Sequence, residues 1–93
     1  MQSLIDFVRR SHGRVIVRVL GYSPAFLDAK GGDWSDDRLR QFFIGEARNL
    51  DSVRRALEAD GVVSIFLIDE ASLNVQHYHI RQLSGEVQFF RVL

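Results

Sequence analysis

The chain has 93 residues, 46% of them hydrophobic and 26% charged, which is typical of one globular domain and too short for two separate cores. It has no cysteine, which excludes disulfides, thiolate metal sites and a cysteine nucleophile. Twelve basic residues balance twelve acidic ones, so the overall positive field of general nucleic-acid binders is missing. We therefore expect a packed domain, residues 1–93, that holds no cofactor.

A short helix capped by Ser3 is predicted to run to about Ser11. The stretch RVIVRVL, from Arg14 to Leu20, is rich in β-branched residues and predicts a strand. The charge order of the N-terminal segment is the reverse of a secretory signal, and no apolar run approaches the roughly 20 residues of a membrane span. These features favour a cytoplasmic protein.

The stretch GYSPAFLDAKGGDWS, residues 21–35, contains the one proline and a pair of glycines, and it predicts an irregular loop. A loop of this length in a small domain is often functional, which makes Tyr22 and Trp34 candidate contact residues. The alternative is that the loop only connects the first strand to the next helix.

Ser35 is predicted to cap the next helix, since Asp36 and Asp37 place negative charge at the positive end of its dipole. The apolar positions keep a helical period as far as Asp60. Asparagine is a good cap, so we expect two helices joined near Asn49, with one long helix as the alternative.

Three strands are predicted after the helices. VVSIFLID, from Val62, is almost wholly apolar and predicts a central strand covered on both faces. VQHYHIRQL, from Val75, follows a turn, and the Ser84-Gly85 pair predicts a tight turn into EVQFFRVL.

The predicted fold is α+β, with helices chiefly on one face of a four-stranded, mostly antiparallel sheet and the order α-β-α-α-β-β-β. If the first strand neighbours VVSIFLID through the helical crossover, that pair is predicted to be parallel and right-handed.

The most distinctive short stretch is His77-Tyr78-His79, which contains two of the three histidines. Side chains two apart on a strand share a face, so both histidines are predicted to share one face and Tyr78 to lie on the other. Cations and apolar residues of the first strand gather with the histidines, and the last strand adds two more residues if its alternation allows. The predicted interaction surface comprises Arg14, Arg18, His77, His79, Arg81, Phe89 and Arg91.

A mixed apolar and cationic face of this kind is usually buried against a partner. Our first hypothesis is a small non-enzymatic interaction or regulatory protein, a homodimer or the partner of another protein. Alternatively, the first helix covers the face, which would leave no functional surface there.

The second hypothesis is an RNA binder or small ribonuclease, with the same cations on phosphate and Phe89 or Tyr78 as stacking platforms. The predicted order of a strand, a helix pair and a three-stranded meander resembles the small bacterial ribosome-dependent messenger-RNA interferase toxins over residues 14–93. The resemblance implies action on RNA, but it carries over no catalytic residue.

The third hypothesis is metal binding by His77 and His79, which need a further ligand such as His12 or a carboxylate. Arg81 on the same face opposes a second cation there. No metal ligand set is therefore assigned.

Overall fold

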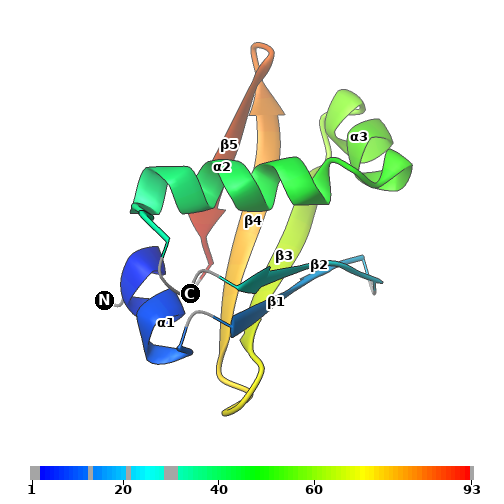
Figure 1. Ribbon diagram of the computed structural model, residues 1–93. Coiled ribbons are helices and arrows are strands. Elements are labelled where there is room, and N and C mark those ends of the chain that lie inside the picture. Colours follow the sequence, from blue (N-terminus) through cyan, green and yellow to red (C-terminus); the bar gives the residue numbers. More distant parts are fainter. Residues whose placement is uncertain (1–2, 13, 21, 29–31, 93) are drawn as a thin grey trace.

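The structure is a computed structural model, and it describes residues 3–12, 14–20, 22–28 and 32–92. These ranges form an α+β fold (Figure 1), which confirms the predicted class. In chain order the elements are α1 (Leu4–Arg10), β1 (Arg14–Val19), β2 (Tyr22–Asp28), α2 (Asp36–Ala47), α3 (Asp51–Glu58), β3 (Val62–Asp69), β4 (Val75–Leu83) and β5 (Glu86–Arg91).

The sheet has five strands instead of the predicted four, because residues 22–28 form β2 and not an irregular loop. The strand order is β2-β1-β3-β4-β5, which places β2 at an edge. Pro24 lies in β2, and an edge strand tolerates proline because only one of its sides pairs with a neighbour. The predicted element order was wrong in omitting this strand.

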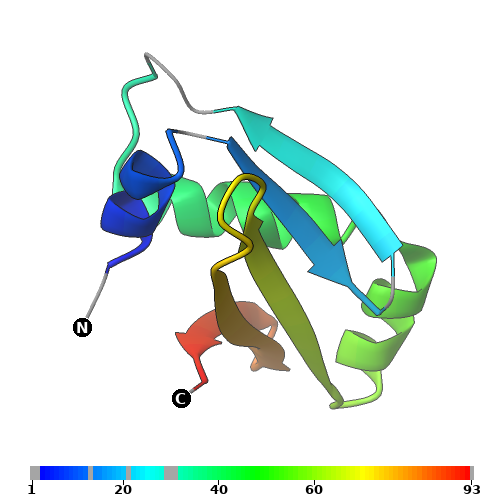
Figure 2. The ribbon, with the colours of Figure 1, turned by 90° about the horizontal axis from the view of Figure 1, so that it is seen from below.

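The neighbours β1 and β3 run antiparallel, so the predicted parallel pair was wrong (Figure 2). The added strand β2 reverses the chain before the helices begin, and β3 therefore enters the sheet from the other end. Two strands precede the helix pair, so the single leading strand on which the toxin resemblance depends is not the observed arrangement.

The predicted helix starts are confirmed. The Ser3 side chain accepts a hydrogen bond from the Asp6 amide at 3.2 Å, and Ser35 accepts one from Arg38 at the same distance. The segment 36–60 forms two helices, α2 and α3, with Leu50 in extended conformation at the N-cap of the second. The predicted break near Asn49 is confirmed.

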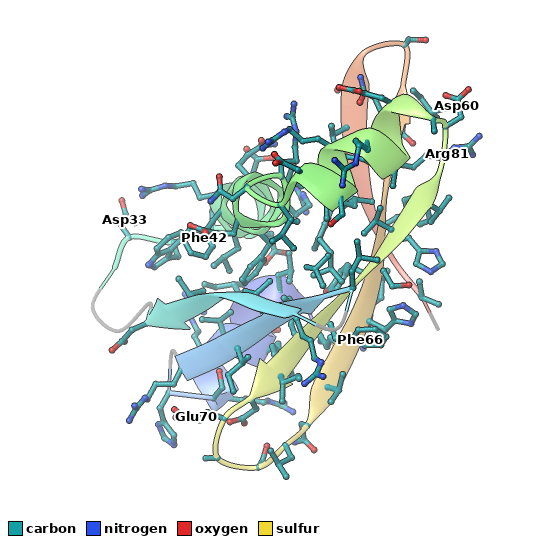
Figure 3. All side chains as sticks on the ribbon, turned by 90° about the vertical axis from the view of Figure 1, so that its right-hand side faces the viewer. Asp33, Phe42, Asp60, Phe66, Glu70 and Arg81 are labelled. Atoms are coloured by element: carbon teal, nitrogen blue, oxygen red, sulfur yellow. The ribbon has the colours of Figure 1, made fainter. Side chains whose placement is uncertain are left out.

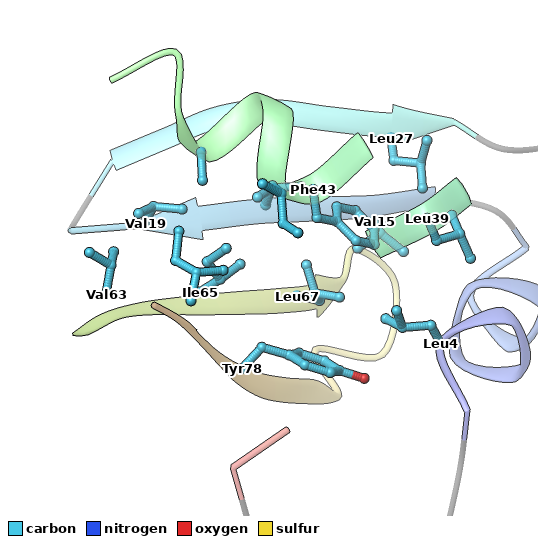
Figure 4. Packing of buried hydrophobic residues seen from close by; sticks show 14 of the residues in the cluster. Leu4, Val15, Val19, Leu27, Leu39, Phe43, Val63, Ile65, Leu67 and Tyr78 are labelled. Carbon is cyan, nitrogen blue, oxygen red and sulfur yellow. The ribbon is translucent and has the colours of Figure 1, made fainter. Parts of the chain in front are cut away.

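All three helices contribute to one hydrophobic core on one face of the sheet (Figure 4). Leu4 from α1, Phe43 from α2 and Leu57 from α3 are each less than 5% exposed. The α1 helix is tied to the start of α2 by the Ile5 amide, which donates to Asp36 Oδ1 at 2.7 Å. The alternative in which the first helix covers the opposite face was therefore wrong.

The predicted tight turn between β4 and β5 is present. Ser84 and Gly85 have φ angles of 52° and 80°, the left-handed pair that a two-residue type I′ hairpin requires. Leu83 consequently lies opposite Glu86, and this pairing sets the register along the whole hairpin.

Candidate functional site

The face of the sheet opposite the helices has no covering layer among the residues that the structure describes. In Figure 3, Phe66 lies on the side of the sheet away from α2 and its residue Phe42. We call the outward side chains of four strands the open face: Arg14, Ile16, Arg18, Val62, Ser64, Phe66, Ile68, Val75, His77, His79, Arg81, Leu83, Glu86, Gln88 and Phe90. Within the described residues β3 is covered on one face only, so the cover predicted for its second face is not supplied there.

Strand pairing arranges the open face in rows across the sheet. Four cross-strand rows follow from the register: Ile16–Ile68–Val75, Arg18–Phe66–His77, Ser64–His79–Phe90 and Val62–Arg81–Gln88. The first row is aliphatic, and the two middle rows carry the aromatic rings. Arg18 belongs to the second row and Arg81 to the fourth. Three of these apolar side chains are well exposed: Val62 at 50%, Val75 at 52% and Phe90 at 42%.

The aromatic rings of the open face touch in a continuous chain. Phe66 and His77 stack with centroids 4.3 Å apart and planes 13° from parallel. His79 meets His77 edge to face at 5.0 Å and Phe90 at 5.8 Å. At 4.3 Å the rings of Phe66 and His77 each cover one side of the other, so that side is closed to a nucleobase.

His77 is half-buried, and its Nε2 atom is buried without a hydrogen-bond partner. The His77 carbonyl accepts from the Val92 amide at 2.9 Å, which continues the ladder past the end of β5. An unpaired buried polar atom costs on the order of 1–3 kcal/mol, so the stacked arrangement is held by its aromatic contacts and not by polar ones.

The arginines of the open face differ in their pairing. Arg14 Nε lies 3.1 Å from Glu70 Oε2, and Asp28 is its cross-strand neighbour on β2. Arg18 and Arg81 are exposed, and neither forms an ion pair with any described carboxylate. The open face therefore presents two cations whose charge the described part of the chain does not neutralise.

Two residues predicted for this face lie on the other side of the sheet. The register places Phe89 opposite Ile80 and Arg91 opposite Tyr78, both on the face that the helices cover. Phe89 stacks on Tyr78 at 4.4 Å and packs against the core. Phe90 and Gln88 take their places, since the two-residue turn pairs position 79 with position 90 and not with position 89.

Tyr78 is separated from its two histidine neighbours, as strand alternation predicted. It is 5% exposed, and its hydroxyl donates to Gln76 Oε1 at 2.8 Å within the core. Burial raises the pKa of the Tyr78 phenol above its ordinary value. Because the phenol lies on the core side of the sheet, it cannot act together with His77 and His79 on one substrate.

The two candidate contact residues of segment 21–35 have different outcomes. The side chain of Tyr22 lies outside the described residues. Trp34 is half-buried: it meets Phe42 edge to face at 5.7 Å, and the Arg38 guanidinium lies 5.4 Å from its ring centre. A Cβ on Gly32 would come within 2.0 Å of Trp34 Nε1, so the indole packs closely over this glycine. Trp34 thus belongs to the start of α2 and not to the open face.

No three histidine or carboxylate side chains of the described residues come together in a way that could hold a metal ion. His77 and His79 lie side by side with ring centres 5.0 Å apart, and the open face brings them no described carboxylate as a third ligand. The third ligands named from the sequence, His12 among them, therefore do not complete the pair.

A shallow depression of about 440 Å³ lies at the end of the sheet where β3 turns into β4. Its lining is Ser11, His12, Arg14, Glu70 and Ala71. Nearby, the Ser72 hydroxyl donates to Asp69 Oδ2 at 2.8 Å, and the Ala71 amide donates to Oδ1 at 3.0 Å. The Ser72 hydrogen bond, with these amides, lowers the pKa of the Asp69 carboxyl below its ordinary value. The network orders the turn.

The described helices are all too short and too polar to cross a bilayer. The chain matches no family model, and no curated protein or solved structure is significantly similar to it.

Proposed function

We propose that the protein is a small interaction module that docks a protein partner on its open face. The observation that carries the proposal is the one-sided layering, in which all three helices pack on one face while aromatic and aliphatic side chains stand on the other. Sheets are normally buried on both faces or are polar on the solvent side, and this face is neither. The proposal keeps the cytoplasmic location expected from the sequence.

The composition of the open face is that of a protein interface. Aromatic residues and arginine are the enriched classes at interface centres, and here Phe66 lies beside Arg18, while Phe90 lies on the strand next to that of Arg81. The aliphatic row Ile16–Ile68–Val75 adds area that stacking on bases would not use. These features support a protein partner, either another chain or a second copy.

The runner-up is single-stranded RNA, favoured by the aromatic chain and by Arg18 and Arg81, which form no ion pair with described carboxylates. Three observations weigh against it. First, Tyr78 and Phe89, the stacking platforms predicted from the sequence, both face the core. Second, one side of each ring in the Phe66–His77 stack is covered. Third, the net charge of the chain is zero. Among the described rings of the open face, Phe90 and His79 lie outside the Phe66–His77 stack.

Filter retention of a labelled oligouridylate tests the RNA alternative. Our proposal expects no retention even at low salt. Retention that falls steeply with salt and disappears in the Arg18→Ala/Arg81→Ala variant would instead establish RNA binding.

Site-specific photo-crosslinking tests the proposal itself. A photoreactive residue is placed at Gln88, which is exposed on the open face, or at Gln41, which is exposed on α2. In the cells that make the protein, we expect a discrete protein adduct from position 88 and none from position 41. Equal adducts from both positions, or none from position 88, would contradict docking on the open face.

A further inference from the structure

We infer that the occupant of the open face is an amphipathic helix of another protein, with an apolar stripe and two carboxylates placed to meet Arg18 and Arg81. This inference rests on the proposed function and specifies the partner of the same surface. It follows from the shape of the face, from the hydrogen-bonding needs of what could lie on it, and from its charge.

The size of the face favours a segment over a second whole protomer. Four strands about 4.8 Å apart and the eight residues of β3 give a projected area of roughly 500 Å². Obligate dimers bury about 1,000 Å² or more of accessible surface per partner, which is more than a face of this projected area offers. A face of this size suits one secondary-structure element laid across it.

The element that can lie on a sheet face is a helix. An extended peptide placed there would leave its backbone N–H and C=O groups unpaired, and it would pair at a sheet edge instead. A helix satisfies its backbone internally and offers one apolar stripe. The protein's own α2, 12 residues long, covers the opposite face of this sheet in this way.

The charges on the open face indicate which charged groups the partner helix carries. Arg18 and Arg81 are exposed and form no ion pair with described carboxylates. The acidic residues of this side of the sheet stand at its borders: Glu86 lies at the start of β5 beyond Gln88, and Asp28 and Glu70 lie beside Arg14. No described carboxylate therefore lies between Arg18 and Arg81. The complement is therefore an acidic partner surface.

The sheet register sets the spacing of the two carboxylates. Arg18 lies opposite Phe66, Phe66 lies opposite His77, and Arg81 is four residues beyond His77. Two strand spacings and four residues of rise place the two arginine Cα atoms about 16 Å apart. On a helix, residues i and i+11 are about 16 Å apart and lie on nearly the same side, so the expected partner helix carries acidic residues three turns apart with apolar residues between them.

The test uses two synthetic helical peptides of about 18 residues, alike except at positions i and i+11. One carries Glu at both positions and the other Lys, with the same leucine stripe between them. Amide signals of the isotope-labelled protein are followed during titration at low ionic strength. We expect the Glu peptide to shift signals of open-face residues and to bind about fivefold more tightly than the Lys peptide.

Matched variants assign the preference to the two arginines. Arg18→Gln/Arg81→Gln should abolish the difference between the peptides. Arg9→Gln/Arg55→Gln, which removes two exposed arginines from α1 and α3, should preserve it.

Each other outcome overturns the inference in a distinguishable way. Equal binding of both peptides to the open face would refute the acidic complement and leave docking on that face intact. Binding on α2 and α3, or no binding of either peptide, would refute the helical occupant. Open-face shifts that depend on protein concentration alone would identify a second copy, and tighter binding of an oligouridylate at the same residues would identify RNA.

Discussion

Asp69 closes β3 and organises the turn into β4. It is 7% exposed, and its carboxylate accepts hydrogen bonds from the Ser72 hydroxyl and from the amides of Ala71 and Ser72. These bonds favour the ionised form, which is why the pKa of Asp69 lies below its ordinary value. A group with a depressed pKa contributes stability above its unfolded pKa of about 3.9, and that contribution is lost as pH falls through the folded pKa.

Replacing Ser72 tests this network. In Ser72→Ala the strongest of the bonds is gone, so we expect lower stability at neutral pH and a smaller loss of stability on acidification than in the wild type. Urea unfolding of both proteins at pH 7 and at several values below pH 4 measures the effect. Parallel pH profiles for the two proteins would show that Ser72 does not set the pKa of Asp69.

The adjacent residues Phe89 and Phe90 show what alternation can and cannot predict. Alternation correctly separated Tyr78 from His77 and His79, because a strand has a period of two whatever its neighbours are. Because Phe89 and Phe90 are the same residue type, their chemistry does not show which of the two points into the core. The two-residue turn at Ser84-Gly85 contained the missing signal, since it pairs position 83 with position 86 and so sets the later pairs.

Matched truncations of these two residues test the register. Phe89 stacks on Tyr78 against the core, so Phe89→Ala should lower the free energy of unfolding by about 2 kcal/mol. Phe90 is 42% exposed, so Phe90→Ala should cost less than about 1 kcal/mol. Denaturant unfolding compares them, and a larger loss from Phe90 would contradict the register.

At the scale of elements, the helix pair and the final meander were predictable because caps and turns are local. Ser35 caps α2 through a bond only three residues away, and the type I′ turn needs only its own two residues. The β2 strand was missed for the opposite reason. Its Pro24 predicts a turn, and only the tertiary position of the strand at the sheet edge makes the proline acceptable.

Two glycines in different elements provide a matched test of backbone conformation. Gly85 has a φ of 80°, so Gly85→Ala should destabilise the hairpin by about 1 kcal/mol. Gly45 lies inside α2 with no atom within 4 Å of an added Cβ, so Gly45→Ala should stabilise the protein by about 1 kcal/mol. Thermal unfolding should therefore shift in opposite directions. Shifts of the same sign would show that one of these backbone assignments is wrong.

At the scale of the molecule, the arrangement is two layers, and the outer side of the sheet carries apolar side chains among charged and polar ones. The sequence predicted that this face would matter, since the near-continuous apolar run of β3 requires cover on both sides. It left open whether a partner or the first helix covers this face, because the position of α1 depends on tertiary contacts such as the hydrogen bond from the Ile5 amide to Asp36. The outward apolar residues are thus available to a partner without being part of the folding core.

Binding and folding thus use different residues of the sheet, and a variant of the open face can separate the two. The variant Val62→Thr/Val75→Thr/Phe90→Thr removes three exposed apolar groups and keeps strand propensity, so its free energy of unfolding should change by less than about 1.5 kcal/mol. The measurement is the yield of the photo-crosslinked adduct from position 88 in this folded variant. We predict that the adduct is lost, and an adduct formed at the wild-type yield would contradict docking on the open face.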